Sequence, residues 1–147
     1  MIGNVGQGIP DLLLGTIKEG AFQPSLILHN AGAPWWSRDG TAVYYLSMRS
    51  DGNRIYRDLY RLTLGSMASE LVVSGLGFPY EQETADGRIL TLDREHRPSL
   101  VTTSNGRAGL TPLASILGLR EYEDNAGYVS LAPDGHTIAF MPSLGKQ

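Results

Sequence analysis

The stretch WWSRDGTAVYYL, residues 35–46, predicts the fold of this chain. Two tryptophans lead into Asp39-Gly40, and an apolar, β-prone run follows the turn. Asp-Gly is a favoured hairpin turn, because glycine adopts a positive φ without steric cost. The stretch therefore predicts a strand, a tight turn and a second strand.

The same turn recurs at a nearly constant spacing. Asp-Gly stands at 39–40, 86–87 and 134–135, and a further Asp-Gly at 51–52 lies inside the first repeat. With Gly40, Gly87 and Gly135 taken as equivalent, the glycines are 47 and 48 residues apart. The residues three and five positions after each glycine share one strand face and are all apolar. They are Val43, Leu90 and Ile138, then Tyr45, Leu92 and Phe140. A period of 40–50 residues is typical of β-propellers, and the chain is predicted to hold three such repeats.

Each repeat is expected to add two outer strands after its hairpin. Residues 57–65 and 69–75 supply them in the first repeat. In the second, residues 97–106 lead to 110–117, where Pro112 restricts any strand to a sheet edge and a short helical turn is the alternative. The third repeat holds only an inner pair of strands. Residues 11–17 and 25–30, which precede the first repeat, are expected to form an outer pair of strands without inner strands of their own.

The predicted fold is therefore all-β, a single unit over residues 1–147 built from four-stranded antiparallel propeller blades. Residues 34–77 and 78–126 form two blades, and residues 1–33 supply the outer strands of a third blade whose inner strands come from 127–147. Such sharing of a sheet by both ends is how a propeller avoids open edges.

Composition excludes several classes of function. The chain has 147 residues, a net charge of −3 and no cysteine, so thiol catalysis, disulfides and cysteine-bound zinc are excluded. Twelve basic residues against 15 acidic ones give no signature of nucleic-acid or anionic-membrane binding. No apolar run approaches the roughly 18 residues that span a bilayer, so no membrane insertion is predicted and the chain is expected to be soluble.

The repeat resembles a known family. Residues 34–64, PWWSRDGTAVYYLSMRSDGNRIYRDLYRLTL, are similar to the blade motif of TolB-like, WD-related β-propellers, and LAPDGHTIAF at 131–140 is a second match. The middle repeat matches only at ADGRIL, residues 85–90. The resemblance implies a non-catalytic propeller that binds another protein. It leaves the alternative of a propeller segment of a larger enzyme, either an oligopeptidase-like gating domain or a propeller lyase.

The resemblance also bears on assembly and compartment. Family propellers have six or more blades, and three cannot close a ring. The chain is therefore expected to be part of a longer propeller or to self-associate as a homodimer with a six-bladed ring, and the near-whole number of repeats favours the dimer. A TolB-like role implies a periplasmic or secreted protein with its signal removed, and otherwise a cytoplasmic one.

Residues with chemical potential are few, and no catalytic residue, cofactor or metal is predicted. There is no G-x-S-x-G nucleophile motif, and Ser66 is expected to lie in a turn. His29, His96 and His136 occupy different repeat positions, which disfavours a shared metal site. The acidic stretches at 50–54, 93–96 and 121–125 are expected to be solvated turns and strand ends, and the alternatives are a cation site at 50–54 or 121–125 and a carboxylate-histidine site at 93–96. Candidate contact residues are Trp35, Trp36 and His136, with one tryptophan predicted to be packed and its neighbour to face elsewhere.

Overall fold

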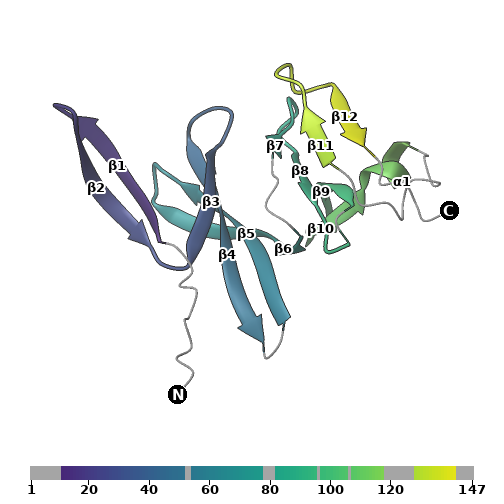
Figure 1. Cartoon of the computed structure of the whole chain (residues 1–147), viewed down its shortest axis with the longest axis horizontal. Coiled ribbons are helices and arrows are strands. Elements are labelled where there is room, and N and C mark those ends of the chain that lie inside the picture. The colour runs from purple at the N-terminus through teal and green to yellow at the C-terminus, as the bar shows by residue number, and fades with distance from the viewer. Residues whose placement is uncertain are drawn as a thin grey trace.

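The computed structural model describes residues 11–51, 54–77, 82–95, 97–105, 107–117 and 128–141. Within these residues the strands form four antiparallel sheets that follow one another in chain order (Figure 1). The all-β, antiparallel prediction is confirmed at this level. No helix among the described residues has the length and apolar character needed to cross a membrane.

The first sheet is a two-stranded hairpin. Strand β1 (Leu12–Lys18) pairs with β2 (Ala21–Leu28) through a tight turn at Glu19 and Gly20. Both turn residues have positive φ, 51° and 78°, which is the backbone twist that suits a two-residue hairpin loop. The register shifts between Leu14 and Gly15, so β2 carries a bulge.

The second sheet has four strands in the order β3-β4-β5-β6. Its strands are β3 (Ala31–Trp36), β4 (Ala42–Asp51), β5 (Arg54–Thr63) and β6 (Ala68–Leu76). Residues 42–46 of β4 are all buried, so this strand is covered on both faces. A strand that is buried on both faces does not alternate between apolar and polar residues, as a half-exposed strand does. The sequence AVYYL at residues 42–46 shows no such alternation.

The third sheet repeats this order with shorter strands. It consists of β7 (Gln82–Glu83), β8 (Ile89–Leu92), β9 (Pro98–Ser104) and β10 (Arg107–Pro112). Strand β10 lies at the sheet edge and ends at Pro112, as the sequence predicted. The short helix α1 (Leu113–Leu117) follows it directly, so both alternatives for residues 110–117 are present in succession.

The fourth sheet is the hairpin of β11 (Tyr128–Leu131) and β12 (Ile138–Met141). Among the described residues, buried side chains form three apolar clusters, one wherever successive sheets meet. The cluster of Ala31, Tyr45 and Leu62 packs against the first hairpin, and the largest cluster joins the two four-stranded sheets. The third cluster joins β8 and β9 to β11, where Val129 is buried.

One part of the predicted fold is wrong for the single chain. The sequence predicted that residues 1–33 and 127–147 share a four-stranded sheet. Instead β1–β2 and β11–β12 are separate two-stranded sheets, and the described sheets do not close into a ring. Each hairpin packs on the sheet next to it in the sequence, and the two four-stranded sheets lie between them (Figure 1).

Candidate functional site

The three Asp-Gly turns have one shared geometry. Gly40, Gly87 and Gly135 have φ of 71°, 80° and 75°, as the sequence predicted for the turn glycines. Each glycine N–H donates to the carbonyl three residues earlier, at 2.9, 3.0 and 2.9 Å. The equivalent backbone conformation confirms that the three turns are aligned correctly in the repeat.

These turns also contact one another across the sheets. Ala85 N–H donates to the Gly135 carbonyl at 3.0 Å, which links the second turn to the third. The Arg38 N–H donates to Glu83 Oε2 at 2.6 Å, which links the first turn to β7. The Leu131 N–H donates to Gln82 Oε1 at 2.7 Å, so β7 also bonds to β11. The turns and the two side chains of β7 therefore form one polar seam over three sheets.

The seam explains why the middle repeat departs from the sequence pattern. Gln82 and Glu83 stand where the first repeat has Trp35 and Trp36. Each of these polar side chains accepts a backbone hydrogen bond from a different neighbouring sheet. A pair of tryptophans could not accept either bond, because the indole is a donor only.

The aspartates of the turns are occupied by their own turns. Asp39 accepts hydrogen bonds from the Ser37 hydroxyl and from the Thr41 N–H and hydroxyl, and these bonds lower its pKa to about 2. The Thr84 hydroxyl donates to Asp86 and is the main cause that lowers the pKa of that carboxyl. The pKa of Asp134 is lowered first by the His136 N–H. Each of these carboxylates therefore stabilises its own turn.

The candidate contact residues lie in two different environments. Trp35 is partly buried and stacks on Tyr44, with ring centroids 5.1 Å apart and planes at 15°. Trp36 is 57% exposed near the end of edge strand β3. The prediction that one tryptophan packs while its neighbour faces elsewhere is confirmed. His136 is exposed on the third turn, where its backbone rather than its ring contacts Asp134.

The remaining candidates do not converge. His29 Nδ1 lies 3.1 Å from Asp11 Oδ2 beside the first hairpin, and both residues are exposed. Ser66 lies in the β5–β6 turn, as predicted, where its Oγ accepts from the Ala68 N–H at 3.3 Å. His96 and residues 52–53 and 121–125 lie outside the described residues. Among the residues that the structure describes, no three His, Cys, Asp or Glu side chains gather as metal ligands.

The prediction of a solvated strand end at residues 93–96 is wrong for Asp93, which is buried. Asp93 is 5% exposed, and its carboxylate accepts from the backbone N–H groups of Glu95 and Arg97 at 3.0 and 2.9 Å. The Arg97 guanidinium donates to the same carboxylate at 2.8 Å. Asp93 thereby organises the β8–β9 turn, while Glu95 remains exposed.

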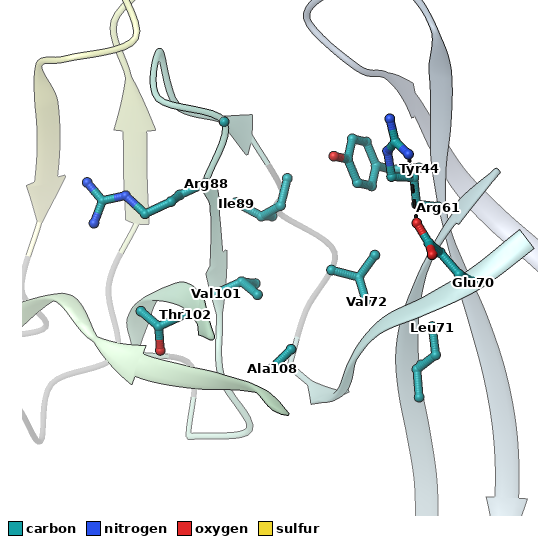
Figure 2. Close-up of a pocket in the computed structure, with 11 residues that line it drawn as sticks. Tyr44, Arg61, Glu70, Leu71, Val72, Arg88, Ile89, Val101, Thr102 and Ala108 are labelled. Carbon is teal, nitrogen blue, oxygen red and sulfur yellow. Dashed lines mark ion pairs between the residues drawn. The ribbon is translucent and has the colours of Figure 1, made fainter. Parts of the chain in front are cut away.

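A groove that the sequence did not reveal lies between the two four-stranded sheets (Figure 2). It encloses about 570 Å³ and has an apolar interior that includes Val72, Ile89 and Val101. On its rim Arg61 Nη1 lies 3.7 Å from Glu70 Oε1. Because the groove draws on strands from two repeats, no contiguous motif could identify it.

Two polar side chains that line the groove, Tyr44 and Arg88, differ in their surroundings. Burial, followed by the charge of Glu83, raises the pKa of Tyr44 above its ordinary value. Figure 2 shows the Arg88 guanidinium directed away from the groove, and it bonds to Asp86 at 2.8 Å. Arg61 of β5 lines the groove from the second sheet.

Comparison with known proteins adds no relative: no family model, no curated protein and no solved structure matches this chain.

Proposed function

We propose that this chain is a non-catalytic scaffold of propeller-type blades that acts through contacts between polypeptides, resembling TolB-like propellers in this respect. Its first partner is a second copy of itself, with which it forms a ring of six blades. The proposal is carried by one observation, the apolar outer face of the β1–β2 hairpin.

Four large apolar side chains form this face, which we call the outer hairpin face. They are Leu13, Ile17, Phe22 and Ile27, with exposed fractions of 51%, 78%, 52% and 49%. Leu13 is paired with Ile27 and Ile17 with Phe22, so the four side chains are cross-strand neighbours. Contiguous apolar surface of this kind on a soluble protein marks an interaction site.

The opposite face of the same hairpin shows what such a surface does when it is covered. Leu12, Leu14, Leu26 and Leu28 pack against the second sheet, over Tyr45 and Leu62. A two-stranded sheet alone is marginally stable in water, and further strands or a packed face are needed to stabilise it. A hairpin that is apolar on both faces is therefore suited to lie between two packing surfaces. Within one chain the second sheet covers one face, and the outer hairpin face is left exposed.

Light scattering on the purified chain tests the association. We expect a species of twice the 15.9 kDa chain mass at micromolar concentration. Ile17→Ser should dissociate it, because the substitution places a polar group in the outer hairpin face. Ile55→Ser is the matched control, since Ile55 is 67% exposed on β5 and should leave the mass unchanged. A wild-type monomer, or equal effects of the two substitutions, would overturn the proposal.

A serine-reactive fluorophosphonate probe tests the non-catalytic part. We expect no stoichiometric labelling of Ser66, because this exposed turn residue would need a neighbouring general base to become nucleophilic. Stoichiometric labelling that a Ser66→Ala variant abolishes would show a hydrolase-type nucleophile and contradict the proposal.

A further inference from the structure

Strands β1 and β5 occupy equivalent positions of the repeat. DLLLGTI at 11–17 and DLYRLTL at 58–64 are offset by 47 residues, the same spacing that separates Gly40 from Gly87. Strand β5 pairs with β6 on one side and with β4 on the other, whereas among the described residues β1 pairs with β2 alone. Strand β1 therefore lacks a neighbour of the β4 kind.

Strands β12 and β4 are equivalent in the same way. Ile138 stands three residues after Gly135, as Val43 stands three residues after Gly40. Strand β4 lies between β3 and β5, whereas β12 pairs with β11 alone in the described part of the chain. Strand β12 therefore lacks a neighbour of the β5 kind, which is the position that β1 represents.

We infer that β12 of one copy pairs antiparallel with β1 of a second copy, with Ile138 opposite Gly15. The register follows from the second sheet, in which Val43 is opposite Leu62. This inference rests on the proposed function and specifies how the two copies meet. Unpaired strand edges are templates for such addition, because each presents a row of free N–H and C=O groups.

The burial pattern supports the same register independently of the repeat alignment. Ile138 packs toward the cluster that contains Leu90 and Leu100. Directly opposed residues point to the same side of a sheet, so Leu13 and Ile17, each two positions from Gly15, would lie on the side of Ile138. The outer hairpin face would then continue the face of β12 that carries Ile138 and packs on the third sheet. A shift of one residue would reverse every side chain and destroy this match.

The partner is a second copy because one chain holds the two hairpins apart. They lie on opposite sides of the two four-stranded sheets (Figure 1). A two-fold arrangement would let each copy give its β12 to the other's β1, so that two identical contacts form at once.

Cysteine cross-linking tests this register, and the chain has no native cysteine to interfere. The Leu64 N–H donates to the Thr41 carbonyl at 3.0 Å, so the next pair, Ala42 and Thr63, is not hydrogen-bonded. Its equivalent between copies is Thr137 and Thr16, both exposed. Pairs of this kind have Cα atoms about 4.5 Å apart, within the range of a disulfide.

The experiment mixes a Thr16→Cys chain with a Thr137→Cys chain under mild oxidation. We expect a covalent heterodimer, formed with roughly tenfold higher yield than in a control that mixes Thr16→Cys with Ser130→Cys. Ser130 is also exposed, but it lies on β11, one strand further from the proposed contact, and two strand spacings exceed disulfide reach. The mixture of Leu14→Cys and Ala139→Cys is a second reporter of the same register.

The outcomes separate this inference from the proposed function. Selective cross-linking of both predicted pairs supports the strand pairing. A dimer by light scattering that cross-links in neither predicted pair, or equally well through Ser130, overturns the pairing and leaves the scaffold proposal intact. A monomer overturns both.

Discussion

The turn glycines allow a matched comparison, because three equivalent positions have different surroundings. Gly40 and Gly135 have nearly the same φ, 71° and 75°. A Cβ added at Gly40 meets nothing within 4 Å, whereas one added at Gly135 would lie 2.7 Å from the backbone nitrogen of Ala85. Backbone strain is therefore shared by the two sites, and crowding is confined to Gly135.

The two costs can be estimated separately. Alanine in the left-handed region costs about 1–2 kcal/mol, and the reduced entropy of the unfolded chain returns about 0.4–1 kcal/mol, so Gly40→Ala should destabilise the fold by about 1 kcal/mol. Gly135→Ala adds an overpacking cost of about 1–3 kcal/mol, because the Ala85 backbone cannot rotate away as a side chain would. Its total should be about 2–4 kcal/mol.

Urea denaturation followed by circular dichroism measures both free energies of unfolding. Hydrogen exchange at the Ala85 amide adds a local measurement, since this N–H donates to the Gly135 carbonyl. We expect Gly135→Ala to accelerate that exchange and Gly40→Ala to leave it close to the wild-type rate. Equal losses of stability at both sites would refute the assignment of the extra cost to contact between the turns.

Three further predictions concern polar groups. Asp39 should titrate with a midpoint near 2 by nuclear magnetic resonance. Because this folded pKa lies below the ordinary 3.8, the ionised carboxylate stabilises the fold above about pH 4, and this stabilisation is lost as pH falls toward 2. An Asp39→Asn variant should lack this pH-dependent part of the stability. A titration midpoint near 3.8 would contradict this. Asp93→Ala should destabilise the fold by about 2–3 kcal/mol in urea, whereas Glu95→Ala should change stability by less than about 0.5 kcal/mol, and similar losses would refute the structural role of Asp93. Gln82→Ala should accelerate hydrogen exchange of the Leu131 amide about fivefold, as expected for loss of one hydrogen bond, and an unchanged rate would show that this bond is not formed in solution.

The features that local sequence determines could be predicted. A glycine after an aspartate predicts its own backbone conformation, and alternation around Val43 and Tyr45 predicts which side chains share a face. The packing of one tryptophan beside an exposed neighbour follows from the same alternation. These inferences need only a few adjacent residues.

Features that depend on residues far apart in the sequence could not be predicted in the same way. The partner sheets of the two terminal hairpins depend on the position of the sheets between them, which no short pattern specifies. The groove beside Arg61 and Glu70 draws on strands from two repeats. The hydrogen bonds of Gln82 and Glu83 join residues 49 and 45 positions apart. From the sequence alone, these two residues are only a mismatch to the tryptophans of the first repeat, and their long-range contacts are visible only in the structure.

The polar seam has a consequence for the modularity of the chain. The second repeat bonds through Gln82 to the repeat after it and through Glu83 to the repeat before it. The first repeat has tryptophans at those positions and cannot replace the second between the same neighbours. The repeats are therefore not interchangeable parts, although their strands and turns are equivalent. Shuffling them would break the seam, and a copy of the second repeat inserted elsewhere in the chain would need new backbone partners for its Gln82 and Glu83 side chains.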